Sequence, residues 1–525
     1  MTDNRYRRLP VGIQSFKVIR EENYLYVDKS DIVWNMVNLG DKYNYLSRPR
    51  RFGKSVLVDT LEAYLEGRKD LFEGLKIMQM EKDWKHYPVI RLDMSRGGAN
   101  EETLRSYLNL RFKDYEEKYN ITPDPTAMLA DRFHAIIATA YKQTGLRVAV
   151  LIDEYDSPLQ HSWRTPEHEK CTGVYREVFA ILKADDEYEH FVFITGITKF
   201  TQISLFSVLN NLSNISFTPE YAAICGITEE EIKENFMPEI RQMSEANNWS
   251  VQETHDRLKA YYDGYHFSDD NMVDIYNPYS LVNALKQRKI KNFWASSGAT
   301  SLLPKFVDNA ELRISNFENI RIMRNTLELS DVSGGGAELF LYQSGYLTIK
   351  ESDEFGYILG FPNEEVKQAL YEMVLPALTL REKSDIQSIQ ANLYAQLGTG
   401  QIDEAMKSLK ALIADVPYSN KKLASMDMEE RYRLIISTIM NAIGLNVEVE
   451  KMISTGRIDM TVKTSRYIYV IELKLRNNGG KEAATDQILN RQYMEPFKAD
   501  KRKVIGLGIE LDEDGKGLLD WKRAE

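Results

Sequence analysis

The sequence has little cysteine and no long apolar segment. Only Cys171 and Cys225 occur among its 525 residues, which excludes a disulfide scaffold or a cysteine-rich zinc site and is typical of a reducing compartment. No run of about 18 consecutive apolar residues is present, so we expect no membrane-spanning helix. The initial segment MTDNRYRRLP lacks the apolar core of a signal peptide. These absences predict a cytoplasmic protein with no membrane partner.

Histidine and excess positive charge are also missing. The seven histidines show no HxH or HExxH spacing, so no zinc site is expected. The net charge of −11 argues against a protein that coats nucleic acid through charge alone. The acidic excess is uneven, because the residues from Ser425 to Glu525 carry 17 Lys or Arg and 17 Asp or Glu, which leaves 50 and 61 in the remainder. The neutral C-terminal segment would bind a polyanion more readily than the acidic remainder.

Strand-like and helical patterns alternate in the first two-fifths of the chain. Apolar, strand-like runs lie at 43–46, 88–93, 147–153 and 191–195. Helical patterns lie between them at 55–65, 101–118 and 128–144. This alternation predicts an α/β fold with a parallel sheet covered by helices on both faces.

The pattern changes beyond this predicted sheet. Residues 227–259 show charged helical patterns that start after a Thr228 cap, followed by the aromatic turns YYDGYHF and YNPYS. The break SGGG precedes LFLYQSGYLTIK and YILGF, which predict a small hairpin in a winged-helix-like region. Helical patterns from 363 to 423 include one helical hairpin, too few for a repeat array. After these come a long helix at 428–443, three short strands and a helix near 482–493.

A phosphate-binding loop is predicted at 48–55, with the sequence RPRRFGKS. It follows a strand and opens a helix, which is the context that a Walker A loop requires. Because a helix N-terminus presents free N–H groups to phosphate oxygens, we assign Arg51, Phe52 and Gly53 to nucleotide binding. Lys54 would reach the β- and γ-phosphates, and the Ser55 hydroxyl would ligate Mg²⁺. The general pattern has glycine at the first position, where this chain has arginine, and the proline that follows removes one N–H donor.

A second nucleotide-binding element is predicted after the apolar run 148–152. Asp153 would hold the Mg²⁺ shell and Glu154 would polarise the attacking water. The strand at 191–194 ends at Thr195, with Thr198 nearby, and we predict a γ-phosphate sensor there. A strand that meets a solvated turn would show the same local pattern, and GKS is a common tripeptide. The order of the elements, rather than either motif alone, favours an ATPase.

Longer motifs carry a family resemblance. YVDKS, LSRPRRFGKS, LIDEYDSPL, ITGITKF and SLFSVLNNLSNIS resemble the AAA-ATPase-like family found beside nuclease domains in bacterial and archaeal proteins. The resemblance covers roughly residues 6–220 and includes arginine at the first loop position, and YYDGYHF and YNPYS resemble the family's continuation into a lid. It implies ATP binding and, more weakly, hydrolysis. Arg50 and Arg51 would touch phosphate, a neighbouring subunit's nucleotide in a homo-oligomer, or only solvent.

The C-terminal segment contains an acidic constellation. Asp459, in GRIDM, is followed 13 residues later by Glu472-Leu473-Lys474 in the apolar strand YIYVIELKL. Residues two apart in a strand point to one face, and unpaired buried charge is costly. A Mg²⁺ ion held by Asp459, Glu472 and the Leu473 carbonyl would explain the charges, while Lys474 would position the attacking water. An exposed salt bridge among the same side chains is the alternative.

This constellation resembles the PD-(D/E)xK nuclease superfamily over roughly residues 425–515, with Ile458 in place of the motif's proline. The resemblance implies two flanking site residues. Glu430, with Glu429 as the alternative, matches a helix-borne acid near the metal, and Gln487, with Tyr493 as a weaker candidate, matches a glutamine that contacts the site. The expected domains are therefore an ATPase-like domain at 1–225, a lid and winged-helix-like region at 226–365, a helical linker at 366–424 and a restriction-endonuclease-like α/β domain at 425–525.

Three functions fit these patterns. The first is an ATP-regulated, Mg²⁺-dependent nuclease that acts on DNA, in defence or mobile-element biology. The second is a nucleotide-driven switch whose C-terminal domain binds nucleic acid or a partner without cutting. The third is an interaction scaffold in which both sites are dormant, which predicts no ATP binding.

Overall fold

A computed structural model describes residues 8–124, 126–199, 211–294, 317–329, 336–379, 383–414, 416 and 427–524. Parts of three sequence predictions lie outside them: residues 200–210 of the family motifs, 333–335 of the SGGG break, and 380–382, 415 and 417–424 of the helical linker. The described residues form two compact units. The first takes those within Met1–Leu303 and Glu318–Glu365, and the second takes those within Pro304–Phe317 and Val366–Glu525.

The first unit is built on a five-stranded parallel sheet, as the alternating pattern predicted. Its strands are β1 (Tyr43–Ser47), β2 (Val89–Asp93), β3 (Val148–Asp153), β4 (Glu189–Gly196) and β5 (Ser213–Asn214), in the spatial order β2-β3-β4-β1-β5. All the neighbouring pairs are parallel. Every residue of β3 is buried, because a central parallel strand is covered on both faces. The strand β4 separates β1 from β3.

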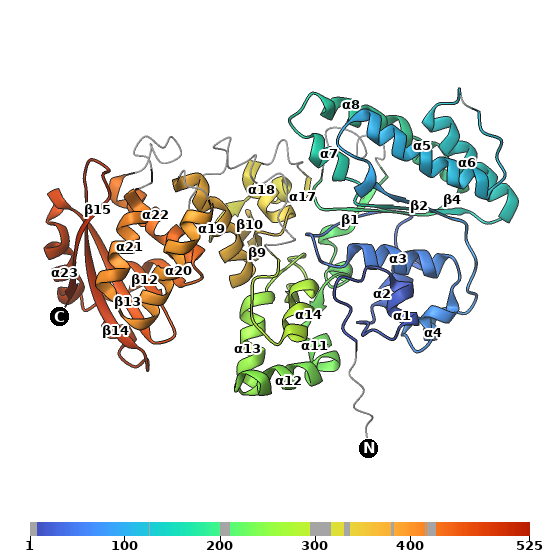
Figure 1. Ribbon diagram of the computed structural model, residues 1–525. Coiled ribbons are helices and arrows are strands. Elements are labelled where there is room, and N and C mark those ends of the chain that lie inside the picture. The colour runs from blue at the N-terminus through green and yellow to red at the C-terminus, as the bar shows by residue number, and fades with distance from the viewer. Residues whose placement is uncertain are drawn as a thin grey trace, which may run out of the picture. The chain divides into compact units, whose positions relative to one another are not determined.

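Helices cover both faces of this sheet. Figure 1 shows α1 (Phe16–Glu21), α2 (Ser30–Asn38), α3 (Lys54–Leu65) and α4 (Ile77–Met80) on one face, and α5 (Glu101–Lys118), α6 (Leu129–Thr144), α7 (Ser157–Ser162) and α8 (Glu167–Phe179) on the other. The short helix α9 (Ile181–Ala184) leads into β4. Because the strands are parallel, the carboxyl ends of β1, β3 and β4 lie at the same edge of the sheet, and α3 begins at this edge.

A helical subdomain follows the sheet. It contains α11 (Glu229–Asn235), α12 (Met237–Asn247), α13 (Val251–Tyr262) and α14 (Pro278–Gln287), joined by the pair β6 (Ile227–Thr228) and β7 (Ile275–Tyr276). Thr228 caps α11 as predicted, and its side chain and that of Glu231 form a reciprocal capping box. The aromatic and aliphatic side chains of this subdomain form one buried cluster around Phe236 and Tyr262.

The remainder of the first unit holds α17 (Arg324–Leu329), α18 (Gly336–Gln343) and a three-stranded antiparallel sheet. Its strands are β8 (Ile320–Ile322), β9 (Thr348–Asp353) and β10 (Gly356–Gly360), in the order β8-β10-β9. The predicted hairpin is β9–β10. The segment LFLYQ, however, is helical and belongs to α18, because its apolar residues pack on several sides rather than alternating between two faces.

The second unit includes α19 (Glu364–Thr379) from Val366 onward. It continues with α20 (Lys383–Thr399), α21 (Ile402–Ala414) and α22 (Met428–Ala442). A five-stranded sheet follows, with β11 (Asn446–Ile453), β12 (Gly456–Lys463), β13 (Tyr467–Leu475), β14 (Lys503–Leu511) and β15 (Leu518–Ala524) in chain order. The helix α23 (Gly480–Asn490) connects β13 to β14, which pair in parallel, and the other pairs are antiparallel. The sequence predicted three strands here, and β14 and β15 extend that sheet.

Opposite faces of this C-terminal sheet carry different helices. Ile468 and Val470 of β13 pack with Ile488 of α23, whereas the Tyr469 hydroxyl donates to the Leu397 carbonyl of α20 at 2.6 Å. Because neighbouring strand residues point to opposite faces, α23 and α20 lie on different sides of β13. None of the helices within the described residues is long and apolar enough to cross a bilayer.

Candidate functional site

The loop between β1 and α3 has the form of a phosphate-binding turn. Arg51 and Gly53 both have left-handed backbone conformations, with φ of 68° and 89°. Gly53 is the residue before α3, and a Cβ atom there would meet no neighbouring atom within 4 Å. The turn therefore ends with the first N–H groups of a 12-residue helix facing out of the loop.

Lys54 lies inside this loop. Its Nζ donates to the carbonyl oxygens of Arg48 and Pro49, each at 2.9 Å, and its side chain is buried. Burial lowers the pKa of Lys54, although the carboxylates of Glu154 and Asp153 act in the opposite direction. An ammonium group held by two carbonyl oxygens can exchange them for phosphate oxygens without leaving the loop.

Asp153 and Glu154 end β3 beside the same helix terminus. Burial raises the pKa of the Asp153 carboxylate, and the nearby Ser55 side chain acts in the opposite direction. Glu154 has a φ of 48°, and its N–H donates to Asp153 Oδ1 at 3.0 Å. Left-handed backbone at a non-glycine residue stores strain, which is concentrated at functional sites. Burial also raises the pKa of Glu154.

A cavity of about 530 Å³ opens beside the loop, within the usual size range of ligand sites. Its polar lining includes the loop residues from Arg50 to Ser55 and Glu154. Its apolar wall is formed by residues that come from three other segments of the first unit: Val11, Ile13, Leu25, Val27, Ile224, Ile227, Phe236 and Val282. A polar end beside a helix terminus and an apolar end are what a nucleotide requires.

Thr195 does not reach this cavity. Its buried hydroxyl donates to the Leu46 carbonyl of β1 at 2.8 Å, and the Thr198 hydroxyl donates to Asp156 at 2.7 Å. Among the described residues, neither threonine belongs to the cavity wall. Asp156 also accepts hydrogen bonds from the backbone of Ile197 and Thr198. The predicted γ-phosphate contact of Thr195 would require its bond to β1 to break.

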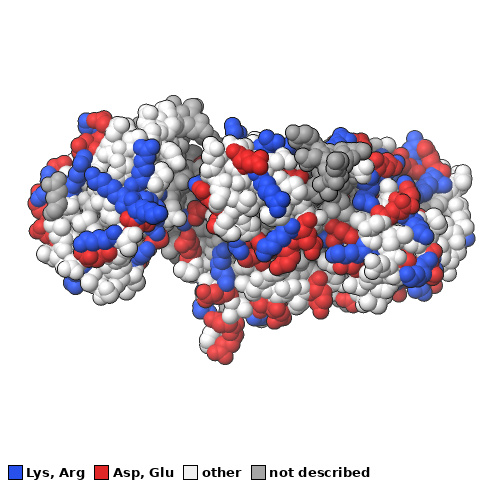
Figure 2. Space-filling view, turned by 90° about the horizontal axis from the view of Figure 1, so that it is seen from below, with Lys and Arg blue, Asp and Glu red and all other residues white. Residues whose placement is uncertain are grey.

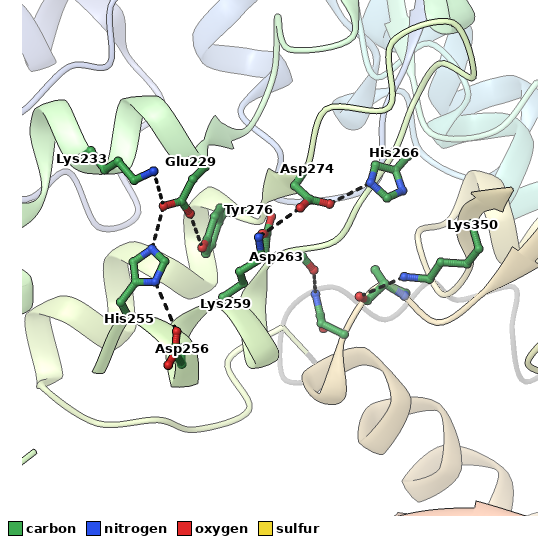
Figure 3. Close-up of polar contacts among 12 residues, drawn as sticks. Glu229, Lys233, His255, Asp256, Lys259, Asp263, His266, Asp274, Tyr276 and Lys350 are labelled. Atoms are coloured by element: carbon green, nitrogen blue, oxygen red, sulfur yellow. Dashed lines mark hydrogen bonds and ion pairs between the residues drawn. The ribbon is translucent and has the colours of Figure 1, made fainter. Parts of the chain in front are cut away.

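The aromatic turns after α13 are held by a polar network (Figure 3). Glu229 of α11 contacts His255 at 2.8 Å and the Tyr276 hydroxyl at 2.9 Å, and His266 contacts Asp274 at 2.8 Å. Asp263, in the YYDGYHF turn, is 1% exposed, and its ion-pair partner Lys259 lies 3.7 Å away. Burial raises the pKa of Asp263 to about 7. These contacts anchor the predicted lid segment to its own helices.

A second site lies in the C-terminal unit. The ladder between β12 and β13 stops at Met460 and Ile471, so the two strands separate at Asp459. The Asp459 carboxylate accepts a hydrogen bond from the Leu473 N–H at 2.9 Å, and the Asp459 N–H faces Glu472 Oε2 at 3.4 Å. The carboxylates of Asp459 and Glu472 therefore converge, as the sequence pattern predicted. The contact between Asp459 and Leu473 is made by the Leu473 N–H.

Two further side chains contact Glu472, which is 1% exposed. Lys474 Nζ lies 4.0 Å from Glu472 and 3.9 Å from Glu429. Gln487 of α23 donates to Glu472 and approaches the Tyr493 hydroxyl at 3.4 Å. Burial and the neighbouring Asp459 carboxylate raise the pKa of Glu472 well above its usual range. The structure thus brings together the predicted pair of acids, the lysine and the glutamine.

The helix-borne acid differs from the first choice made from the sequence. Glu430 is exposed, whereas Glu429 accepts hydrogen bonds from the Leu475 N–H at 3.1 Å and from Asn478 at 3.3 Å. Successive helix positions differ by about 100° around the axis. The phase in which α22 buries its apolar side chains directs position 429, not 430, to the end of β13.

Comparisons with known proteins match this division of the chain. A model described as "Predicted AAA-ATPase" matches residues 10–206, and a model of the PD-(D/E)XK nuclease superfamily matches residues 427–521. A protein of Azotobacter chroococcum mcd 1, described as "Uncharacterized protein in vnfD 5'region", is 30% identical over 525 residues, which cover 98% of each chain. The chain belongs to this family of AAA-ATPase-like proteins with a C-terminal nuclease-superfamily domain.

In this ATPase–nuclease family member, the donor set at Glu472 suits a magnesium ion. No three His, Cys, Asp or Glu side chains gather into a metal-binding group among the residues that the structure describes. Magnesium needs fewer protein ligands, because it keeps several waters and takes one or two carboxylates. Two converging carboxylates next to a strand backbone meet that requirement, and Ser55 with Asp153 would do so beside nucleotide phosphates.

The buried position of Arg48 and the apolar wall of the cavity could not be recognised from the sequence. Arg48 is 1% exposed and donates to the carbonyls of Ser216 and Tyr221 at 2.9 Å each, with its guanidinium 4.1 Å from the ring of Phe267. The family's arginine at the first loop position thus supports the loop rather than pointing to the cavity. Arg51 is exposed and lies 4.8 Å from the ring of Tyr279. The apolar cavity wall, being uncharged, gives no sequence signal.

Proposed function

We propose that this protein binds and hydrolyses ATP in its N-terminal unit and uses its C-terminal unit to cleave DNA with a divalent metal ion. The observation that carries the proposal is the convergence of Asp459, buried Glu472 and Lys474 at one strand end. Two carboxylates held this close repel each other, and a bound cation relieves that repulsion. The domain division at 225, 365 and 424, a cytoplasmic location and assembly into a homo-oligomer are parts of the same proposal.

At the nuclease site, Asp459 and Glu472 would hold the metal, together with the Leu473 carbonyl. The metal supplies Lewis-acid chemistry and a reactive water when bound. Gln487 orients Glu472 through its hydrogen bond. Lys474, 23% exposed and between two carboxylates, would position the attacking water and stabilise the charge that develops on the phosphate. Glu429 holds the end of β13 and Lys474 in place.

At the nucleotide site, the α3 N-terminus and Lys54 would bind the phosphates, and Ser55 and Asp153 would hold the Mg²⁺ that accompanies them. Glu154 would orient the attacking water. The apolar wall of the cavity would take the base. Arg51, Phe52 and Gly53 belong to the loop that encloses the phosphates, and Thr195 remains a proposed sensor.

Charge on the C-terminal unit is compatible with a nucleic-acid substrate. Its terminal residues are balanced in charge, unlike the acidic remainder. Figure 2 shows Lys and Arg side chains gathered on the visible face of this unit, at the left of that view. Phosphate groups are attracted to such basic surfaces independently of sequence.

Cleavage of DNA by the purified full-length protein tests the proposal. Linear, circular and single-stranded DNA are incubated with and without Mg²⁺ and ATP. We expect Mg²⁺-dependent cleavage that Asp459→Asn and Lys474→Ala abolish. Glu429→Gln should reduce it, whereas Glu430→Gln, at the exposed neighbouring position, serves as the matched control and should leave it unchanged. Equal cleavage by wild type, Asp459→Asn and Lys474→Ala would remove the nuclease assignment.

A second candidate is a nucleotide-driven switch that binds nucleic acid or a partner without cutting it. Internal pairing favours this candidate, because Gln487 already holds Glu472 and Arg433 of α22 lies 3.4 Å from Asp459. In that case Lys54→Ala should abolish the function while Asp459→Asn leaves it intact. The same set of variants therefore separates the two candidates.

A further inference from the structure

An arginine that the nuclease motif does not include lies against the acidic pair. Arg433 is one helical turn beyond Glu429 on α22, and its side chain is 16% exposed. Its Nη1 lies 3.4 Å from Asp459 Oδ1, and its Nη2 lies 2.9 Å from Glu450 Oε1. The shorter contact indicates that Glu450, rather than Asp459, is the residue that fixes this guanidinium.

Glu450 has an unusual backbone for a strand residue. It lies inside β11, between Val449, which pairs with Met460, and Lys451, which pairs with Ile458. This position is directly across from Asp459. Its φ is 53°, and it is the only non-glycine residue with positive φ within a strand of the described parts of the chain. Such strain persists only where the surroundings enforce it, and it clusters at functional sites.

Two guanidinium groups share a single carboxylate, that of Glu450, beside Asp459. Glu450 is shared by Arg433 and by Arg457, whose guanidinium lies 3.2 Å from the same oxygen and whose side chain is 54% exposed. When Asp459 turns to a metal ion, Glu450 alone is left to neutralise both guanidinium groups. Arginine carries five N–H donors in a fixed planar arrangement that matches phosphate oxygens. Donors of Arg433 therefore remain available after its contact with Glu450 is made.

We propose that Arg433, positioned by Glu450, binds a phosphate of the nucleic-acid backbone next to Asp459. The inference rests on the proposed nuclease site and adds a substrate-binding residue to it. The contact to Asp459 is the weaker of the two, so the guanidinium can release this carboxylate to a metal ion while Glu450 retains it. Arg433 then lies where a phosphate beside that ion would be.

Salt-dependent DNA binding tests this role without cleavage. Anisotropy of a fluorescein-labelled DNA duplex is titrated with the full-length protein in EDTA at several salt concentrations. Each phosphate contact contributes about 0.9 to the slope of log K against log salt concentration. We expect Arg433→Gln to weaken binding and lower the slope by about 0.9. Arg433→Lys should keep most of the slope, because its charge remains.

The controls separate phosphate binding from support of Asp459. Glu450→Gln keeps the charge of Arg433 but frees the side chain, so DNA binding should persist in EDTA while Mg²⁺-dependent cleavage falls. If Arg433 only supports Asp459, Arg433→Gln will show the wild-type salt slope and a weaker affinity for Mg²⁺ in calorimetric titrations. That result overturns the inference, and so does a wild-type protein that binds no duplex. Thermal unfolding of each variant verifies that the fold is retained.

These outcomes are distinguishable from failure of the proposed function. A wild-type protein that binds DNA with an Arg433-dependent slope but never cleaves it would remove the nuclease assignment and keep the phosphate contact. If the protein cleaves DNA and Arg433→Gln matches the wild type in both salt slope and cleavage rate, the nuclease assignment stands and the phosphate contact is removed.

Discussion

Restoring the general phosphate-loop pattern by Arg48→Gly should destabilise this protein. The substitution creates GxxxxGKS, which from the motif alone would be expected to improve nucleotide binding. In the structure, however, Arg48 joins the loop to the segment after β5 through the carbonyls of Ser216 and Tyr221, and it packs against Phe267. Glycine would remove all three contacts.

The expected cost is about 5 kcal/mol, within a range of roughly 3–8 kcal/mol. Each long-range hydrogen bond from the charged guanidinium contributes about 1.5–3 kcal/mol, and the contact with the Phe267 ring contributes about 1 kcal/mol. Burial opposes them, because it lowers the pKa of Arg48 to about 10, a penalty of roughly 3 kcal/mol that the variant escapes. Glycine adds about 0.5–1 kcal/mol of backbone entropy, and the carbonyl of buried Ser216 loses its donor, at about 1–3 kcal/mol.

Thermal unfolding of the full-length protein measures this effect, in the transition whose midpoint shifts when ATP is added. The matched control is Arg51→Gly in the same loop, where φ is 68° and the side chain is exposed. Glycine suits that conformation, so the control should change stability by no more than about 1 kcal/mol. We expect Arg48→Gly to unfold several degrees earlier and to bind ATP more weakly. An Arg48→Gly variant as stable as wild type, with tighter ATP binding, would refute the supporting role of Arg48.

Three further predictions concern the first unit. Burial raises the pKa of Asp263 to about 7, so the folded state retains a proton that the unfolded state loses near pH 4. Stability should therefore fall by roughly 4 kcal/mol between about pH 4 and 7 and then level off. The urea midpoints at pH 5 and pH 8 should differ less in Asp263→Asn than in the wild type, and an equal difference would contradict the assignment. Thr228→Ala should lower stability by about 1 kcal/mol through loss of the capping box, measured by urea denaturation against the exposed control Glu230→Ala. ATP at about 100 times its Kd should stabilise the wild type by about 2.7 kcal/mol, and Lys54→Ala should eliminate this thermal shift; a shift retained in Lys54→Ala would argue against phosphate binding at the loop.

The central sheet could be predicted from the sequence because its chemistry is local. A parallel strand such as β3 is covered on both faces and so reads as an unbroken apolar run that ends in Asp153. The shared orientation of Glu472 and Lys474 was likewise predictable, since strand periodicity fixes which face each side chain takes. In both cases the pattern that specifies the structure lies within a few consecutive residues.

Features that depend on distant partners could not be predicted. The carbonyls that hold Arg48 come from positions 168 and 173 residues away, and the sequence does not indicate that they lie there. The choice between Glu429 and Glu430 depends on the helix phase, which tertiary packing sets. The left-handed backbone of Glu450 could not be predicted either, because its conformation follows from the pairing of β11 with β12 and not from its residue type.

The position of β4 between β1 and β3 has a mechanical consequence. The backbone N–H of Arg48, at the start of the phosphate loop, donates to the Gly196 carbonyl at 3.2 Å, and the N–H of Tyr155, next to Glu154, donates to the Thr195 carbonyl at 3.0 Å. The phosphate loop and the segment after β3 are thus hydrogen-bonded to adjacent carbonyls at the end of β4. Under the proposed hydrolysis, a change in the distance between Lys54 and Glu154 would displace that strand end, together with the backbone of Ile197 and Thr198, which donates hydrogen bonds to Asp156. The end of β4 therefore links the phosphate loop to the acidic residue after β3, so that movement of one part of the site would be passed to the other through this strand.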